Sequence, residues 1–309
     1  MNSNIVLRGV VPAHLTPFDN NYEIDENELR NHIKDIVQID GVGGIISNGH
    51  AGEVTSLSKS EYSKVLKIVK NEINGKIPLI SGVIGENQKD AVEMAINAKN
   101  SGADAILLFP PNSFELEAAL DFERPFKYVY DIADSVDIPI VLFQFSLSSK
   151  KSYTTDTLVK MVEEIPSIIA IKEGTDNIPR YEENLYALRN CSRKVSVLCT
   201  NNTMLLASLA IGGDGIISGS GSVISNILAD LWKAVEAGNL RLAREINEKM
   251  YPLIRAFYTS PLIDMHNRMK CALNIMGKQK YCISRPPLLP VKEEERKVIE
   301  EALIKGGLL

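Results

Sequence analysis

Lys172 is the residue whose position most clearly suggests covalent chemistry. It ends the apolar run of residues 167–172, so a buried strand should carry its amine to a place with little water. Loss of hydration disfavours the ammonium and leaves a nucleophilic amine near neutral pH. Such an amine condenses with a ketone to a Schiff base, an electron sink for C–C or C–O cleavage. The alternative is a lysine that only reaches from a strand end into water or pairs with Glu173.

The segments that must position this lysine are short apolar runs alternating with longer amphipathic stretches. The runs are almost wholly apolar, as in parallel strands that helices cover on both faces. The expected strands are residues 9–15, 43–47, 77–81, 105–109, 138–145, 168–172, 195–200 and 215–218. The clearest helical segments are residues 26–38, 59–71, 88–100 and 155–164. Asp25 is placed to cap the first helix, and Ser58 with Glu61 to form a capping box on the second.

Eight strand–helix units of roughly 25 residues predict an α/β fold, a (β/α)8 TIM barrel. A doubly wound sheet is the alternative, but no GxGxxG motif follows the first strand, so a dinucleotide site has no support. After about residue 225 the pattern is helical throughout, with expected helices at residues 227–237, 240–258, 261–276 and 292–304. We therefore expect a catalytic barrel over residues 1–225 and a C-terminal helical extension over residues 226–309, packed on the barrel.

The composition excludes several classes of protein. The chain has 309 residues, 45% hydrophobic and 24% charged, as in ordinary globular proteins. A formal net charge of −5 offers no basic surface to a nucleic acid. We find no signal-peptide pattern and no apolar run long enough for a membrane span. The four cysteines form no CxxC pair. We therefore expect a cytoplasmic protein that binds neither nucleic acid nor membrane.

Five motifs, in order and at barrel spacing, resemble the dihydrodipicolinate synthase / N-acetylneuraminate lyase family of Schiff-base barrel enzymes. They are GVVPAHLTPF at 9–18, NGHAGE at 48–53 with the trailing SLS at 56–58 and Glu61, ISGVIG at 80–85, IAIKE at 169–173 and DGIISG at 214–219. The likeness covers nearly the whole chain. It implies a class I lyase in which Lys172 forms the Schiff base, without a cofactor, on pyruvate or another small 2-oxo acid. It also implies a homo-oligomer, a dimer or tetramer.

The chain departs from this family where protons are moved. Many members carry a YNVPxRT-type segment, whose tyrosine relays protons and whose arginine holds a substrate carboxylate in the synthases. By the resemblance, Phe143 stands at the tyrosine and Ser148 at the arginine, and a tyrosine given across a subunit contact falls near Asn112. A phenyl ring transfers no proton. We therefore expect a divergent aldolase or dehydratase rather than a true dihydrodipicolinate synthase.

The remaining candidate site residues follow the expected strands. His50 is our candidate for acid–base work in place of the relay, with a backbone-bonded loop histidine as an equal alternative. Backbone N–H groups of the same loop should bind a substrate carboxylate. These expected binding residues are Gly49, Ala51 and Gly52, with Ser81, Thr200, Gly219 and Ser220 at other strand ends. Asn201 follows Thr200 at the seventh strand end, and Glu53 is expected to tie the loop structurally. The SGSGS run at 218–222 is either an anion cradle, for phosphate or carboxylate, or a tight turn.

The C-terminal extension carries a dense polar group. Asp264 and Arg268 are four residues apart and can pair on a helix, which would lock that helix onto the barrel or a neighbouring subunit. Alternatively, Tyr258 or Arg268 reaches a distal substrate carboxylate in place of the missing arginine. Asp264 and His266 are two residues apart and face different directions, so we expect no metal site there.

Two other functions stay open. A barrel that has lost catalysis and binds a small 2-oxo acid as a sensor fits the missing relay, although a sensor has no need of a poised amine. A metal-dependent barrel aldolase would need carboxylate and histidine ligands, which the expected strand ends lack.

Overall fold

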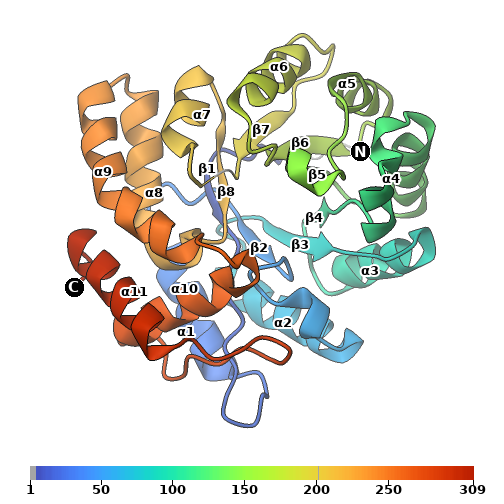
Figure 1. Cartoon of the computed structure of the whole chain (residues 1–309). Helices are drawn as coiled ribbons and strands as arrows, with labels where there is room; N and C mark the ends of the chain where they lie inside the picture. The colour runs from blue at the N-terminus through green and yellow to red at the C-terminus, as the bar shows by residue number, and fades with distance from the viewer. Residues whose placement is uncertain (1–4, 201) are drawn as a thin grey trace.

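The computed structural model describes residues 5–200 and 202–309, so Asn201 lies outside it. Eight parallel strands form one sheet in the order β1-β8-β7-β6-β5-β4-β3-β2 (Figure 1). Their bounds are β1 Gly9–Pro12, β2 Ile45–Ser47, β3 Leu79–Val83, β4 Ala105–Leu108, β5 Ile140–Gln144, β6 Ile168–Glu173, β7 Ser196–Cys199 and β8 Gly215–Ser218. Parallel bridges from Val10 to Val42 and from Ala13 to Ile46 complete the ring. The predicted (β/α)8 barrel is confirmed, and the doubly wound alternative is wrong.

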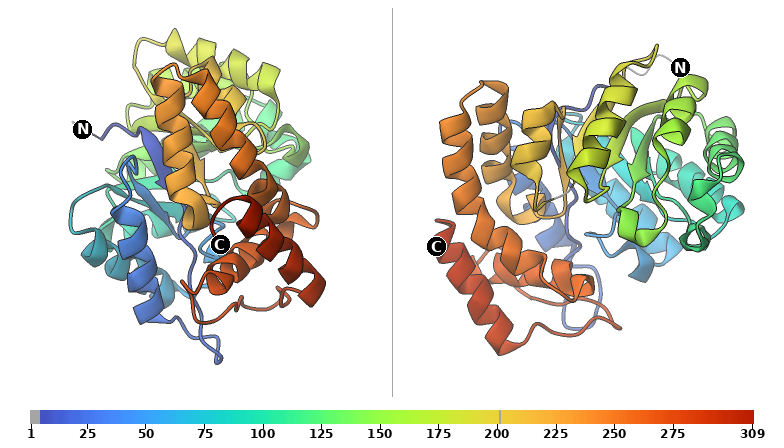
Figure 2. Two further views of the ribbon diagram at one scale, coloured as in Figure 1. Left: turned by 90° about the vertical axis from the view of Figure 1, so that its left-hand side faces the viewer. Right: turned by 45° about the horizontal axis from the view of Figure 1, so that its top comes forward.

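Helices surround this ring, so the strands have no face left for water (Figures 1 and 2). Every strand residue is buried except Ile169, which is half-buried, as the apolar runs predicted. The outer helices are α1 Glu26–Val37, α2 Lys59–Ile73, α3 Gln88–Asn100, α4 Glu123–Ser135, α5 Thr155–Glu164, α6 Ile178–Arg189, α7 Leu205–Ile211 and α8 Gly221–Glu236. Asp25 caps α1, and Ser58 and Glu61 form the expected capping box on α2.

Short 3-10 helices lie in the loops that follow the strands. They are η1 Val54–Ser56, η2 Asn112–Leu116, η3 Ala118–Leu120, η4 Leu147–Ser149 and, before α10, η5 Leu262–Asp264. Within the part of the chain that the structure describes, no helix is both long and apolar enough to cross a membrane.

The C-terminal helices gather on one side of the barrel (Figure 2). They are α9 Leu240–Phe257, α10 Met265–Ile275 and α11 Glu293–Lys305; α9 packs on α8, and α11 packs on both α9 and α10. The boundary expected between residues 225 and 226 falls inside α8, which packs on β1 and β8. We therefore propose that the barrel ends with α8 and that the extension begins at α9.

Candidate active site

A cavity of about 330 Å³ opens at the C-terminal ends of the strands. Seven of the predicted site residues line it: Gly49, His50, Ala51, Phe143, Lys172, Thr200 and Gly219. Three do not: Gly52, Ser81 and Ser220. The Ser81 hydroxyl is fully buried and bonded to the Tyr62 hydroxyl at 2.7 Å. The strand-end rule therefore brings most of the predicted residues to one cavity.

Lys172 enters this cavity from the end of β6. Its side chain is buried, and burial lowers the pKa of its amine from 10.5 to about 7. Its nearest described partner is the Phe143 ring, whose centroid lies 3.9 Å from Nζ. Glu173 does not pair with it, because that carboxylate accepts the Thr175 N–H at 2.9 Å and the Asn184 Nδ2 at 3.0 Å. The amine is thus held out of water, facing the cavity, with a large neutral fraction at neutral pH.

Three aromatic rings, those of His50, Phe143 and Phe145, line one wall of the cavity, and Phe109 packs behind them. Phe143 contacts Phe145, with centroids 4.2 Å apart, and packs edge-on against Phe109 at 5.1 Å. His50 packs edge-on against Phe109 at 4.9 Å and is itself exposed at the rim. Desolvation by the surrounding protein lowers the pKa of His50 below its ordinary value, and the positive charges of Lys172 and Lys151 lower it further. Within the described residues this ring makes aromatic contacts and no hydrogen bond, so the backbone-bonded alternative is wrong.

The β2 loop supplies fewer amide donors than the sequence suggested. The Gly52 N–H donates to the Gly49 carbonyl at 3.1 Å and so closes a turn instead of facing a ligand. The N–H groups of Gly49 and Ala51 have no backbone acceptor among the described residues, and both residues line the cavity. An anion nest here would rest on these two donors.

Glu53 fixes this loop to the C-terminal extension. Its carboxylate forms a buried ion pair with Lys270 and accepts the Arg285 N–H at 3.1 Å. Lys270 is fully buried, and its Nζ also donates to the Ile283 carbonyl at 2.8 Å. The structural role predicted for Glu53 is confirmed, and the extension is its main partner.

The loop after β8 is a closed turn. The Ser220 N–H donates to the Ser218 Oγ and to the Tyr258 Oη, each at 3.1 Å. The hydroxyls of Ser218 and Ser220 lie 2.7 Å apart and each lies within hydrogen-bonding distance of the Asn202 Oδ1, so their two hydrogens are shared among these contacts. The Ser220 N–H and the two hydroxyls are thus used within the protein, which favours the interpretation of the SGSGS run as a turn over an open anion cradle.

Comparisons with known proteins place this cavity in a family. The model of the dihydrodipicolinate synthetase family matches residues 6–305. The chain belongs to this family. The 4-hydroxy-tetrahydrodipicolinate synthase of Methanocaldococcus jannaschii is 30% identical over 306 residues, covering 98% of this chain and all of the relative. The synthase of Methanopyrus kandleri is 29% identical, covering 98% of this chain and 97% of its own.

Solved structures of this family share the fold. The dihydrodipicolinate synthase of Thermotoga maritima superposes with a TM-score of 0.89 at 25% identity, covering 98% of this chain and 100% of its own. A monomeric dihydrodipicolinate synthase variant reaches a TM-score of 0.92 at 24% identity over both chains in full. As a member of the dihydrodipicolinate synthetase family, this chain is a lyase of the class I aldolase type, as the motifs predicted.

The C-terminal extension contributes more residues to the active-site cavity than the sequence suggested. Tyr258, at the C-terminal end of α9, and His266, in α10, both line the cavity beside Lys172. Sequence reasoning weighed Tyr258 as a substrate contact but missed His266. The sequence did contain a signal for His266. It lies four residues before Lys270 on the same helical face, so a pair between Lys270 and Glu53 of the β2 loop would also turn His266 toward the barrel.

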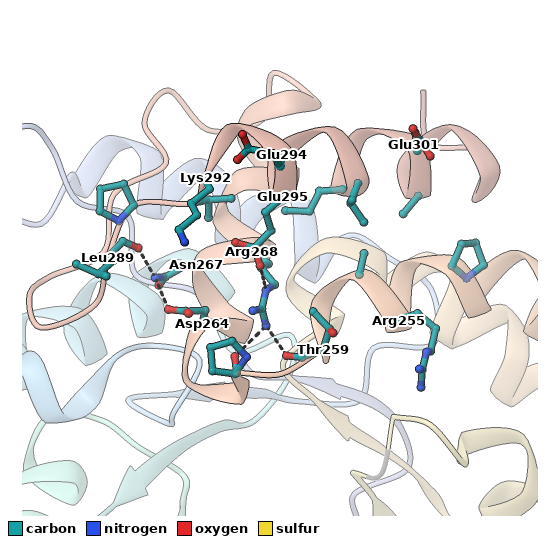
Figure 3. Close-up of a pocket in the computed structure, with 18 of the residues that line it drawn as sticks. Arg255, Thr259, Asp264, Asn267, Arg268, Leu289, Lys292, Glu294, Glu295 and Glu301 are labelled. Carbon is teal, nitrogen blue, oxygen red and sulfur yellow. Dashed lines mark hydrogen bonds and ion pairs between the residues drawn. The ribbon is translucent and has the colours of Figure 1, made fainter.

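Arg268 points away from the active site, and the proposal that it reaches a substrate is wrong. Its buried guanidinium binds Glu295 at 2.5 Å and the carbonyl oxygens of Thr259 and Pro261 at 2.7 and 3.1 Å (Figure 3). It lines a separate cavity of about 790 Å³ between α9, α10 and α11. The expected Asp264–Arg268 pair is also wrong, because Glu295 takes that place. Arg268 does hold a helix by an ion pair, but it joins α10 to α11 within the extension, whereas we expected a contact with the barrel or a neighbouring subunit.

No set of three or more His, Cys, Asp or Glu side chains is grouped to hold a metal ion within residues 5–200 and 202–309. The metal-dependent alternative therefore has no ligand set among the described residues.

Proposed function

We propose that this enzyme forms a Schiff base between Lys172 and pyruvate, or a pyruvate-bearing 2-oxo acid, and uses it for aldol cleavage, aldol addition or dehydration. The observation that carries the proposal is the buried amine of Lys172 facing a cavity, with its pKa lowered to about 7. The neutral amine attacks C2 of the oxo acid, and water leaves to give an iminium. The iminium then accepts the electron pair that is left on C3 when the C3–C4 bond breaks.

The cavity suits the two ends of a 2-oxo acid. The N–H groups of Gly49 and Ala51 can receive the carboxylate, while C2 lies toward Lys172. The remainder of the substrate then meets the aromatic wall on one side and the residues after β6, β7 and β8 on the other. These include Asp176, Thr200 and Asn202. A tail that is partly apolar and carries hydroxyl groups fits these two walls.

We further propose that the chain is not itself a 4-hydroxy-tetrahydrodipicolinate synthase. In support, Phe143 has no hydroxyl to relay a proton, and Ser148 is exposed with no charge to hold a second carboxylate. Asn112 is engaged elsewhere, since it donates to Glu86 at 2.7 Å and accepts from Lys151 at 3.1 Å. Assayed beside the Methanocaldococcus relative, this chain should form no 4-hydroxy-tetrahydrodipicolinate. Formation at the relative's rate would refute the distinction.

Reductive trapping tests the Schiff base directly. The protein is incubated with pyruvate and borohydride, the intact chain is weighed, and the adduct is mapped. We expect a single adduct on Lys172 and none in Lys172→Ala. Lys151→Ala is the matched control, since Lys151 is also buried, beside the Phe145 ring, and lies outside the cavity lining. Saturable pyruvate binding without any adduct would instead support the sensor.

Assembly and location are further parts of the proposal. A homo-oligomer is supported by Leu116 and Leu120, 88% and 64% exposed on the short helices after β4, where water is a poor environment for them. Light scattering that finds only monomer, as in the monomeric variant among the structural neighbours, would contradict it. Four free cysteines support a reducing cytoplasm, which cell fractionation checks.

A further inference from the structure

Two side chains of the C-terminal extension meet at the end of β8. A Cβ atom placed on Gly219 would lie 3.3 Å from the His266 Nε2 and 3.6 Å from the Tyr258 Oη. Both residues line the cavity that Lys172 enters. The imidazole and the phenol therefore face the same small volume, above a residue that has no side chain of its own. A substrate bound to Lys172 in this cavity therefore has two side chains nearby that can exchange protons, Tyr258 at the end of α9 and His266 in α10.

The His266 ring is buried but unpaired. It is 9% exposed, and within the described residues neither ring nitrogen makes a hydrogen bond. A buried imidazole normally bonds at least one nitrogen. One whose nitrogens are free beside a cavity is placed to bond whatever enters that cavity.

The helix α10 is fixed so that His266 keeps this position. Lys270 lies one turn further along, on the same face, and is paired with Glu53 of the β2 loop. Arg268, two residues from His266, faces the other way and is bound to Glu295. Contacts on both sides thus fix the rotation of α10 about its axis, and a catalytic side chain on a helix needs such a fixed orientation.

Both groups are uncharged at neutral pH. Burial, then the nearby His50, Lys270 and Lys172, lower the pKa of His266 to about 3, so its ring is neutral at pH 7. Burial raises the pKa of Tyr258, so the phenol stays protonated. Its oxygen accepts the Ser220 N–H at 3.1 Å and lies beside the Ser218 and Ser220 side chains, and in the proposed complex its hydrogen turns to a substrate oxygen. The shifts thus set the protonation states: the imidazole has a free lone pair and the phenol keeps its hydrogen, as a base and a hydrogen-bond donor require.

We propose that His266 is the catalytic base of this enzyme and that Tyr258 is the hydrogen-bond donor beside it, together replacing the relay that Phe143 lacks. This rests on the proposed Schiff base at Lys172. In the iminium of pyruvate, the His266 Nε2 takes a proton from C3. The C–H electron pair forms the C2–C3 double bond, and the C2–N π electrons move to nitrogen, which gives a neutral enamine and an imidazolium. The imidazolium returns a proton when the step reverses.

Exchange of the pyruvate methyl hydrogens in D2O isolates this step, because it needs no second substrate. The loss of methyl signal is followed by proton NMR with native protein, His266→Ala and His266→Gln. General-base assistance is typically worth about 10²–10⁴-fold, so both variants should slow exchange by that factor while borohydride still traps pyruvate on Lys172. Added imidazole should restore part of the rate in His266→Ala. Glutamine keeps a hydrogen-bonding amide but accepts no proton, so native exchange in His266→Gln would overturn the role as base.

Comparison variants separate the possible failures. His50→Gln removes the exposed imidazole at the rim; a large loss there with native exchange in the His266 variants would assign the base to His50 and overturn the proposal. If His266→Ala does not fold, Gly219→Ala supplies the test, since its methyl group would lie 3.3 Å from the His266 Nε2 and crowd that ring. We expect slow exchange with trapping retained, and native exchange would overturn the proposal. A native protein that neither traps nor exchanges pyruvate refutes the Schiff base itself, whereas trapping with His266-independent exchange refutes this inference alone.

Discussion

The proton on Lys172 offers the most direct measure of the site. Burial lowers the pKa of this amine from 10.5 to about 7. At pH 7 about half of the Lys172 side chains are then neutral, whereas roughly one in 3,000 would be neutral at a pKa of 10.5. The shift therefore increases the nucleophilic form about 1,500-fold at neutral pH. We predict that the reactivity of Lys172 rises with pH to a midpoint near 7 and is level above it.

Competitive acetylation measures this midpoint in the protein without substrate. A trace of isotopically labelled acetic anhydride is added at pH values from about 5 to 11, and the labelling of each lysine is read by peptide mass spectrometry. Lys59, whose side chain is 89% exposed, serves as the internal reference within the same sample. A midpoint for Lys172 near 10.5 would refute the argument that burial leaves this amine neutral, and with it the observation that carries the proposed function.

The same shift has a consequence for stability. Between pH about 7 and 10.5 the unfolded chain holds a proton on Lys172 that the native chain does not. The free energy of unfolding should therefore rise with pH over that window through this group, and the contribution should be lost as the pH falls through 7. Lys172→Met should remove that part of the pH dependence in urea unfolding curves. An unchanged slope in the variant would contradict the shift independently of any labelling.

Three further predictions concern the surroundings of the amine. Lys270→Met strands the buried Glu53 carboxylate and should lower the free energy of unfolding by about 3–5 kcal/mol in urea; adding Glu53→Gln should recover part of this loss, and an additive double variant would contradict the coupling. Phe143→Tyr should change pyruvate hydrogen exchange little, because His266 already serves as base; a large gain would show that the missing phenol limits the enzyme. Dialysis against EDTA should leave trapping on Lys172 unchanged, and a loss that zinc or magnesium restores would favour the metal-dependent aldolase.

The barrel was predictable because its signals are local. Each strand is an apolar run, and each cap is a side chain within three residues of the helix that it starts. The end of the apolar run at residues 167–172 also predicted where the Lys172 amine lies. The expected domain boundary lies inside α8 for a local reason as well: the Gly- and Ser-rich residues 218–222 are typical of a turn, yet α8 begins at Gly221. Packing against β1 and β8 overrides that weak preference.

The rest of the site depends on contacts between distant segments. A hydroxyl or N–H group at a strand end is not available to a ligand when it already bonds to another part of the protein. The Ser81 hydroxyl bonds to the Tyr62 hydroxyl, and the Ser220 N–H donates to the Tyr258 oxygen. The rotation of α10 about its axis decides whether His266 or Arg268 lines the active-site cavity. That rotation is set by Glu53, which lies 217 residues before its partner Lys270, and by Glu295, which lies 27 residues after its partner Arg268. No spacing within α10 contains this information.

The ring at position 143 shows which force governs the amine. The face of Phe143 lies 3.9 Å from the Lys172 Nζ, and a cation–π contact would favour the ammonium by about 0.5–2 kcal/mol. The fall in pKa from 10.5 to about 7 corresponds to about 5 kcal/mol in favour of the neutral amine. Desolvation therefore outweighs the attraction of the ring. An aromatic wall without a hydroxyl keeps Lys172 dry and nucleophilic, but it carries no proton. A site built in this way needs its proton carrier from another element, and α10, anchored to the β2 loop by the Lys270–Glu53 pair, brings His266 to that place.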